Sequence, residues 1–314
     1  MQFCEKKTGS PDVAILMATY NAGKYLAQQL DSFEMQKYQN WRLYVSDDNS
    51  RDDTLSLLQT YRNKWGDNKL NVFPGPCKGF SANFLSLVCN PDIRAEFYAY
   101  SDQDDIWEND KISCAIETLS RVDENVPALY CARTLLVDEI NNEIGYSACF
   151  KKKPCIKNAM VQSIAGGNTM VINNAARQLL LNAGIVDVVS HDWWTYLVVT
   201  ACGGQVFYDE CAHVRYRQHA KNLVGSNSGI LQKVARAKML CSGDFSLWVE
   251  KNLNALARIE KNIPEKQLKL IRRFKKIRKS NVFSRTLGII STGLYRQTLL
   301  GNLGLYFAFL FKKI

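Results

Sequence analysis

Short apolar runs alternate with helical patterns over the first 130 residues of the chain. Each run has the length of a buried strand, and the segments between the runs repeat apolar residues every three or four positions, as one face of a helix does. The expected strands are 13–17, 41–46, 70–73 and 96–101, and the expected helices include 26–33, 55–61, 81–88 and 112–119. Strands that alternate with helices in this way imply βαβ crossovers and a parallel sheet.

The pattern is less regular after residue 128. We expect a strand at 128–138, a hairpin turn at 139–143, a mobile loop at 151–157, a strand at 170–172, and helices through 179–181 and 191–202. Gly203 and Gly204 should end the last of these helices. From residue 228 onward the pattern is helical, with a break at Pro264. The sequence therefore predicts an α/β domain over residues 1–225 and a helical C-terminal extension over residues 226–314.

Charge divides the chain at almost the same place. The 314 residues hold 40 Lys and Arg against 30 Asp and Glu, a net charge of +10. Residues 221–314 carry 19 of the basic and 4 of the acidic residues, so the remainder is mildly acidic. A basic surface over the whole chain is what a nucleic-acid-binding protein needs, and this distribution argues against one. We expect no nucleic-acid partner.

The C-terminal extension raises the question of a membrane. Residues 286–311 are apolar and aromatic, but Arg296, Gln297 and Asn302 interrupt them, and a span needs about 20 uninterrupted apolar residues. Residues 266–285 hold nine Lys and Arg and no acid. This combination is typical of a segment that lies on an anionic membrane surface. The alternative is a set of core-packing helices with a solvated cationic face, which could also pair two chains, so the oligomeric state stays open.

Cysteine usage indicates a reducing compartment. The chain has ten cysteines but no Cys-x-x-Cys pair, and its first eleven residues are polar, unlike a signal peptide. We expect reduced thiols and a cytoplasmic protein, held peripherally at the inner face of the cell membrane by the extension.

Three polar motifs follow three of the expected strands. They are Thr19-Tyr20-Asn21, Asp47-Asp48 and Asp102-Gln103-Asp104-Asp105. Ligands of an open parallel sheet bind at the carboxyl ends of its strands, so these motifs should meet at one edge. Each motif alone is a common loop or cap, and their coincidence is the stronger signal.

The acidic motif suggests a cation site. Three carboxylates within four residues repel one another, and Mg²⁺ or Mn²⁺ with its preference for oxygen ligands would compensate that charge. The alternative is that the acids open the helix expected near Asn109, where negative charge favours the helix dipole. Both hold if Asp105 caps the helix while Asp102 and Asp104 face the crevice.

Histidines are few and two of them lie in dense polar and aromatic motifs. The chain has His191, His213 and His219. His191 precedes Asp192 and two tryptophans, and His219 ends the sequence YRQH. These settings favour a functional over a structural role only modestly.

Six motifs, in order, resemble a known family. They are VAILMATYNAGKYL, VSDDNSRDDT, KGFSANF, YSDQDDIW, HDWW and YRQHAKN, spread over residues 12–225. The chain resembles family 2 inverting glycosyltransferases, most of all the bacterial rhamnosyltransferase-type enzymes of surface polysaccharide synthesis. The resemblance implies the GT-A fold, which is Rossmann-like with a mostly parallel central sheet flanked by helices. It makes residues 1–225 the nucleotide-sugar-binding and catalytic domain.

The resemblance also assigns site residues. Those that would hold the nucleotide are Thr19, Tyr20, Asp47, Asp48, Gly79, Asn83 and Asp102. Asp102 and Asp104 correspond to the DXD motif, in which Asp104 is the direct ligand of Mn²⁺ or Mg²⁺, and His219 would be a further ligand. Asp192 stands where the family keeps its catalytic base. Gly167, Asn168, His191, Trp193 and Trp194 would line the sugar or acceptor pocket, although the two tryptophans fit the core of their helix equally well.

Two departures from the family pattern refine this expectation. The second motif reads DDNS where DDGS is commoner, and asparagine tolerates the left-handed backbone that such a turn needs. The QxxRW motif of processive synthases is absent, which argues for the addition of one sugar or a few.

The implied activity is the transfer of a sugar from dTDP-rhamnose or a UDP-hexose. The acceptor would be a polysaccharide or a lipid-linked saccharide. The alternative is a catalytically inactive protein of the same fold that serves as a scaffold in a membrane assembly.

Overall fold

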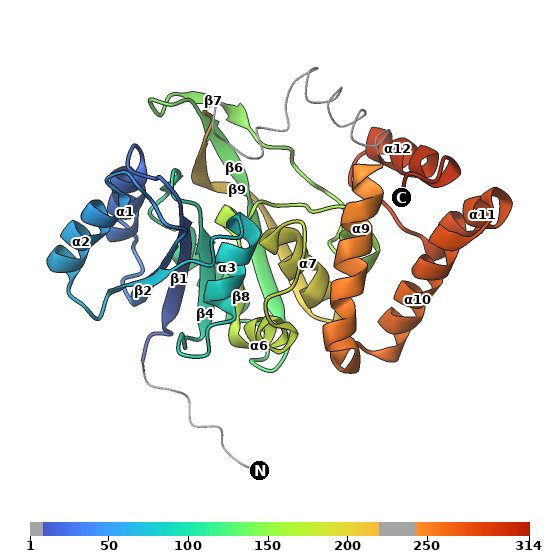
Figure 1. Cartoon of the computed structure of the whole chain (residues 1–314), viewed down its shortest axis with the longest axis horizontal. Helices are drawn as coiled ribbons and strands as arrows, with labels where there is room; N and C mark the ends of the chain where they lie inside the picture. Colours follow the sequence, from blue (N-terminus) through green and yellow to red (C-terminus); the bar gives the residue numbers. More distant parts are fainter. Residues whose placement is uncertain (1–8, 220–242) are drawn as a thin grey trace, which may run out of the picture.

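The computed structural model describes residues 9–219 and 243–314. Its centre is a single mixed sheet with helices on both faces and a group of helices at one end (Figure 1).

The amino-terminal half of the sheet is parallel, as expected. Its strands are β1 (Val13–Thr19), β2 (Trp41–Asp47), β3 (Leu70–Pro74) and β4 (Phe97–Ser101), in the spatial order β3-β2-β1-β4. The helices α1 (Leu26–Glu34), α2 (Thr54–Trp65) and α3 (Phe80–Val88) connect them, and α4 (Lys111–Leu119) follows β4. Because β1, β2 and β4 are parallel and in register, their carboxyl ends lie at one edge.

The other half of the sheet is mixed. The strand β8 (Val171–Asn173) is antiparallel to both β4 and β6 (Ala128–Val137), and β9 (Gln205–Arg217) is parallel to β6. Two short strands, β5 (Ile106–Trp107) and β7 (Glu143–Tyr146), pair antiparallel with β9 and β6. The mostly parallel α/β fold is therefore confirmed, whereas β5, β7 and β9 were not predicted. The long β9 escapes a search for apolar runs because most of it is only half-buried and it carries charged residues.

Apolar residues of β1 alternate between two cores. Val13, Ile15 and Met17 face a cluster that contains residues of α1, α2 and α4, while Ala14 and Leu16 face a cluster built around α3, α6 (Asn174–Ala183) and α7 (His191–Ala201). A strand covered on both faces reads as a continuous apolar run, which is why β1 was recognisable. Two shorter helical turns, α5 (Ile156–Ala159) and η1 (Gly167–Thr169), complete this part.

The helices after residue 243 share the second core. They are α9 (Asp244–Ala255), η2 (Leu256–Asn262), α10 (Glu265–Lys279), α11 (Val282–Thr292) and α12 (Leu299–Leu310), and they stand together at one end of the molecule (Figure 1). Phe245 of α9 stacks on Trp193 of α7 with ring centroids 5.9 Å apart. Pro264 precedes α10, as expected. The predicted boundary at residues 225–226 lies outside the described residues and stays a prediction.

The segment 151–157 is held rather than free. The backbone N–H of Lys152 donates to Gln297 Oε1 at 3.0 Å, and Gln297 Nε2 donates to the Lys152 carbonyl at 2.9 Å. The expectation of a mobile loop is therefore wrong at this point, because a glutamine distant in sequence satisfies the backbone of the loop.

Two further observations concern expectations from composition. The eight cysteines within the described residues are all free, in agreement with reduced thiols. Among helices in the described ranges, none combines the length and apolar character that crossing a bilayer requires.

Candidate functional site

The ends of β1 and β2 are joined through one carboxylate. Thr19 Oγ1 donates to Asp47 Oδ1 at 2.8 Å, and the backbone N–H and hydroxyl of Ser50 donate to the same side chain at 2.9 and 2.6 Å. Asn49, between them, has a φ of +64°. The expected left-handed turn is thus confirmed, with asparagine in the place of glycine.

Asp48 is held against the segment that leads into α3. Its Oδ1 accepts the backbone N–H of Cys77 at 2.8 Å. A Cβ atom at Gly75 would lie 2.2 Å from that oxygen, so glycine is needed for this close approach. Gly79 begins α3 with a φ of +86° and open space where a side chain would be. The backbone at Gly79 is therefore accessible to a ligand.

Asn83 and Tyr20 flank the same carboxyl edge. Asn83 is buried, and its Nδ2 donates to the Thr19 carbonyl at 3.4 Å. Tyr20 is 60% exposed, and its backbone is fixed by Gln103, whose Oε1 accepts from the Tyr20 N–H at 2.8 Å. This bond joins the loop after β1 to the loop after β4, so the first and third polar motifs meet as expected.

The three aspartates of the acidic motif differ in burial. Asp102 and Asp104 are partly exposed, whereas Asp105 is completely buried. Asp105 accepts from Asn168 Nδ2 at 2.6 Å and from the backbone N–H of Arg217 at 3.1 Å. Asp105 does not cap the following helix, because α4 begins only at Lys111, after β5. The capping alternative is therefore wrong.

His219 reaches the acidic motif from the other end of the sequence. Its Nε2 lies 2.8 Å from Asp104 Oδ2, and its ring stacks on Tyr25 with centroids 5.2 Å apart. The structure thus brings together Asp104 and His219, two of the three residues that the resemblance offered as metal ligands.

Burial, together with repulsion from neighbouring carboxylates, raises the pKa of Asp102 to about 7. Burial is the largest cause, the charges of Asp104 and Asp192 add to it, and Lys111 opposes it. Asp192 lies in the first turn of α7, where its Oδ1 accepts the Trp193 N–H at 2.6 Å. Asp192 is therefore close enough to the acidic motif for its charge to act there.

His191 is buried next to Asp192. Its buried ring stacks on Phe84 with centroids 3.8 Å apart, and burial lowers its pKa to about 4, so the ring is neutral at pH 7. A Cβ atom at Gly167 would lie 2.2 Å from His191 Nε2. The turn that contains Gly167 and Asn168 is thus wedged between His191 and Asp105, behind the acids rather than open to solvent.

The two tryptophans of α7 lie in the core. Trp194 has no exposed surface, and Trp193 is stacked on Phe245 while its Nε1 donates to the Ala159 carbonyl at 2.6 Å. The expectation that they line the sugar or acceptor pocket is therefore wrong, and the alternative of core packing is confirmed, because neither indole presents a face to a ligand.

Two basic residues at this edge were missed in the sequence. Arg217 is 1% exposed; its Nε donates to the Asp104 carbonyl at 3.0 Å and its Nη1 to the Glu139 carbonyl at 2.8 Å. Lys111 is also buried, with its Nζ 3.1 Å from the centre of the Trp107 ring, and burial lowers its pKa well below the usual range. Arg217 belongs to the YRQH motif, which was noted only for its histidine. Nothing in the sequence indicates that Lys111 is buried, since a lysine at the start of a helix normally faces water.

A surface hollow elsewhere does not compete with this site. It measures about 500 Å³ and is lined by Trp41, Arg42 and Lys69 among others, beside the amino-terminal end of β2. The carboxylates described above gather at the opposite ends of the strands, and ligands of parallel sheets bind there.

The architecture matches the GT-A fold of solved glycosyltransferase structures. The solved structure of TarS 1-349 from S. aureus in complex with UDP-GlcNAc matches 90% of this chain and 89% of that chain, with a TM-score of 0.52 and 16% identity. The mannosyltransferase PcManGT from Pyrobaculum calidifontis, in complex with GDP-Man and Mn²⁺, matches 91% of this chain and 86% of its own, again with a TM-score of 0.52 and 16% identity. At this identity the likeness is one of fold.

Sequence comparison gives the family. The model for glycosyl transferase family 2 matches residues 14–165. The dTDP-rhamnosyl transferase RfbG of Shigella flexneri is 30% identical over 252 residues, which are 77% of this chain and 84% of that protein. An uncharacterized glycosyltransferase of Rickettsia typhi, RT0329, is 24% identical over 75% of this chain and 76% of its own. This chain belongs to glycosyltransferase family 2 and is a glycosyltransferase.

The raised pKa of Asp102 predicts a pH dependence of stability for the metal-free chain. The unfolded carboxyl loses its proton near pH 4 and the folded one only near pH 7, so the folded state holds more protons between these values. The free energy of unfolding should therefore fall as the pH rises from about 4 to about 7. Urea unfolding in chelator should show a smaller fall for Asp102→Asn.

The matched control is Asp67→Asn, which changes a carboxylate whose side chain is 81% exposed. It should keep the wild-type pH dependence. An equal fall in stability for the wild type and Asp102→Asn would contradict the electrostatic description of the site.

Proposed function

We propose that this enzyme is a metal-dependent inverting hexosyltransferase. It moves one sugar from dTDP-rhamnose or a UDP-hexose to a hydroxyl group of a polysaccharide or lipid-linked oligosaccharide. The observation that carries the proposal is the meeting of Asp102, Asp104, His219 and Asp192 at one edge of the sheet, although they come from three distant parts of the chain. The name of the rhamnosyl relative supports dTDP-rhamnose as the donor.

The acids and the imidazole at this edge fit a divalent cation. Asp102 and Asp104 repel each other, and His219 Nε2 lies beside Asp104 Oδ2, so hard oxygen ligands and one nitrogen converge with uncompensated negative charge. Asp102, Asp104 and His219 would hold Mn²⁺ or Mg²⁺. Bound there, the ion would neutralise the charge that develops on the departing diphosphate. The presence of Mn²⁺ in the structure of the mannosyltransferase PcManGT from Pyrobaculum calidifontis supports this assignment.

The loops after β1, β2 and β3 would hold the nucleotide. The Asp47 carboxylate already accepts hydrogen bonds from Thr19 and Ser50. We therefore assign Asp47 to shaping the turn that positions Asp48 beside the nucleotide base. The exposed ring of Tyr20 is available to the base or ribose. The open backbone at Gly79, with Asn83 one turn later, allows close approach of the donor.

Asp192 would act as the base of a single displacement. Its carboxylate takes the proton of the acceptor hydroxyl while that oxygen attacks the anomeric carbon and the bond to the diphosphate breaks. One base without a second nucleophile gives inversion at the anomeric carbon. The neutral His191 ring, the Gly167 turn and Asn168 lie behind Asp192 and Asp105, so we assign them to positioning these acids on the sugar side of the site.

Exchanging the base tests the proposal. Asp192→Asn should lower the rate of transfer by about 10²–10⁴ because the acceptor hydroxyl is no longer deprotonated. The nucleotide affinity should stay within about twofold, since the metal ligands are unchanged. The measurement is release of the nucleoside diphosphate from dTDP-rhamnose and UDP-glucose, with saccharide acceptors present.

Asp187→Asn is the control, because its carboxylate lies five residues earlier and its side chain is 78% exposed. It should retain wild-type turnover. Near wild-type turnover of Asp192→Asn would show that the base is misassigned, and a wild type without any transfer would favour the inactive scaffold.

We propose further that the enzyme works as a peripheral protein at the cytoplasmic, inner face of the cell membrane. The helices α11 and α12 carry exposed apolar stripes on their outer sides, in addition to the residues they bury: Val282, Phe283, Leu287, Ile290, Leu299, Leu300, Leu303, Tyr306, Phe307, Leu310 and Phe311. On α12 the exposed residues recur at the spacing of one helical face. Contiguous apolar surface of this kind marks an interaction site.

An anionic bilayer matches this surface best. The neighbouring α10 exposes a set of cationic side chains: Lys266, Lys269, Arg272, Arg273, Lys276 and Lys279. Cationic charge beside an apolar, aromatic face fits lipid headgroups and the acyl boundary beneath them.

Vesicle sedimentation tests this placement. Leu300→Ser/Phe307→Ser should weaken binding to phosphatidylcholine–phosphatidylglycerol vesicles at least about tenfold, because two inserted apolar side chains are lost. Lys276→Gln/Lys279→Gln should weaken it by about fivefold per lysine at low salt. Met35→Ser/Leu55→Ser, which alters exposed apolar residues of α1 and α2, should change nothing.

Unchanged binding of the Leu300→Ser/Phe307→Ser variant would contradict the membrane placement. A dimer in light scattering that the same variant dissociates, without vesicle binding by the wild type, would identify a second copy of the chain as the occupant instead.

A further inference from the structure

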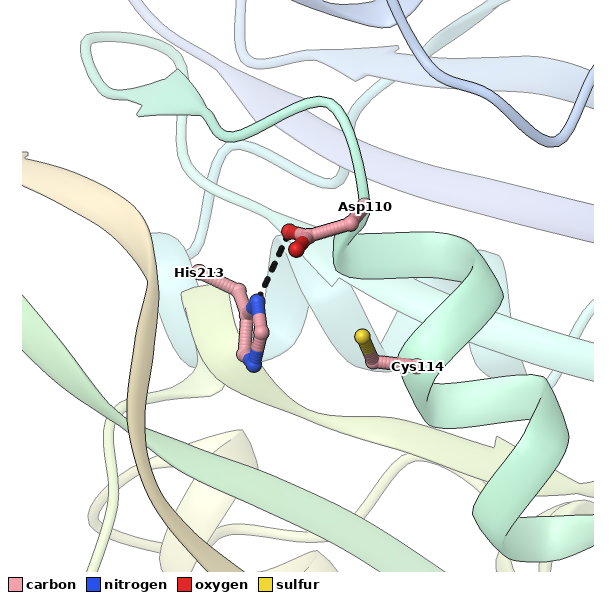
Figure 2. A group of neighbouring side chains, drawn as sticks. All are labelled: Asp110, Cys114 and His213. Carbon is pink, nitrogen blue, oxygen red and sulfur yellow. Dashed lines mark hydrogen bonds and ion pairs between the residues drawn. The ribbon is translucent and has the colours of Figure 1, made fainter.

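Three side chains with different metal-binding atoms converge outside the donor site. Asp110 and Cys114 lie one turn apart on the first part of α4, and His213 projects from β9 toward both of them (Figure 2). One ligand atom of each lies within 4.8 Å of the others. Residues four apart share a helix face, so α4 presents an oxygen and a sulfur atom together.

Backbone pairing fixes this arrangement. The strand β5, which leads into α4, pairs with β9 through Ile106 with Arg215 and Trp107 with Val214. The N–H of Glu108 then donates to the His213 carbonyl at 3.0 Å. Backbone hydrogen bonds thereby hold the start of α4 beside the His213 ring without the help of a metal ion.

The surroundings of His213 resemble those of a metal-binding histidine. Its Nδ1 lies 2.8 Å from Asp110 Oδ1, and its Nε2 faces Asp209 Oδ2 at 3.4 Å. Asp209 is itself oriented by the Tyr130 hydroxyl and the Cys211 N–H, both at 2.8 Å. Histidines that bind a metal typically donate a hydrogen bond from their other ring N–H to a carboxylate, and this bond sets the tautomer and the ring orientation. Asp209 is in place for that role.

We propose that Asp110, Cys114 and His213 bind a zinc ion, with water completing the tetrahedron and Asp209 orienting the histidine. The mixed oxygen, sulfur and nitrogen set suits Zn²⁺, whereas Mg²⁺ and Mn²⁺ prefer oxygen ligands. The His213 side chain is 10% exposed and that of Asp110 is 37% exposed, so the ring is shielded while the ion has a route of entry.

Such an ion would fasten α4 to β9. Both elements lead to the donor site: β9 ends at Arg217, whose guanidinium bonds to the Asp104 carbonyl, and α4 begins at Lys111 beneath the acids. The zinc site has a structural role in this account, and it does not depend on the proposed function.

Cobalt is a suitable probe, because a thiolate ligand gives Co²⁺ a charge-transfer absorption in the near ultraviolet that oxygen and nitrogen ligands do not. The full chain, stripped with chelator, should bind one equivalent of Co²⁺ with this absorption, and Zn²⁺ should displace it. Cys114→Ser should abolish the absorption. Asp209→Asn should weaken cobalt binding about 10–100-fold while leaving the absorption at saturation.

Two controls separate this site from others. Cys202→Ser, which changes a half-buried cysteine at the end of α7, should keep the absorption. Asp104→Asn should also keep it, so that failure of the donor site and failure of this site are distinguishable. Zinc should raise the melting temperature of the wild type and not that of Cys114→Ser.

The inference is overturned if stoichiometric Co²⁺ gives no thiolate absorption, or if the absorption survives in Cys114→Ser. An unchanged melting temperature with zinc would likewise contradict a structural zinc site and leave only a hydrogen bond between Asp110 and His213.

Discussion

Negative charge crowded at one edge of the sheet is the constraint around which the site is built. Asp102, Asp104 and Asp105 follow β4, and Asp192 adds its charge from the first turn of α7. Carboxylates brought together and partly buried destabilise one another unless protons, hydrogen bonds or cations compensate them. The chain satisfies Asp105 internally, and we propose that a bound cation compensates Asp102 and Asp104.

Asp105 is the acid that is compensated by groups within the protein. Asn168 and the backbone of Arg217 donate to it, and Lys111 adds a buried basic group nearby. This bonding turns Asp105 into part of the scaffold and leaves Asp102 and Asp104 partly exposed at the carboxyl edge of the sheet. Arg217 also bonds to the Asp104 carbonyl, so the same buried side chain supports the loop on which the exposed acids stand.

The sequence predicted the parts of this arrangement that depend on local pattern. The strands β1, β2 and β4 are recognisable because they are short and buried on both faces. The meeting of the polar motifs follows from the rule that parallel strands end at one edge. The turn at Asn49 was predictable from the backbone preference of a single residue type. The meeting of the polar motifs at the carboxyl edge was therefore predictable from the sequence.

The parts that depend on distant contacts were not predictable. The half-buried β9 carries no apolar run, and Arg217 becomes important only once β9 lies beside the acidic loop. Trp193 and Trp194 follow Asp192 in sequence, yet helical geometry turns both indoles into the core. Gln297 fixes the loop at Lys152 across 145 residues, a contact that no local pattern reveals.

Calorimetric titration with UDP and with dTDP, each with and without Mn²⁺, tests the central claim most directly. The claim is that the uncompensated acids at the carboxyl edge form a metal-dependent nucleotide site. It predicts that at least one of the two nucleotides binds only when Mn²⁺ is present, and that Asp104→Asn loses this binding while Asp67→Asn keeps it. A folded wild type that binds neither nucleotide with Mn²⁺, or binds both equally without it, would contradict the account.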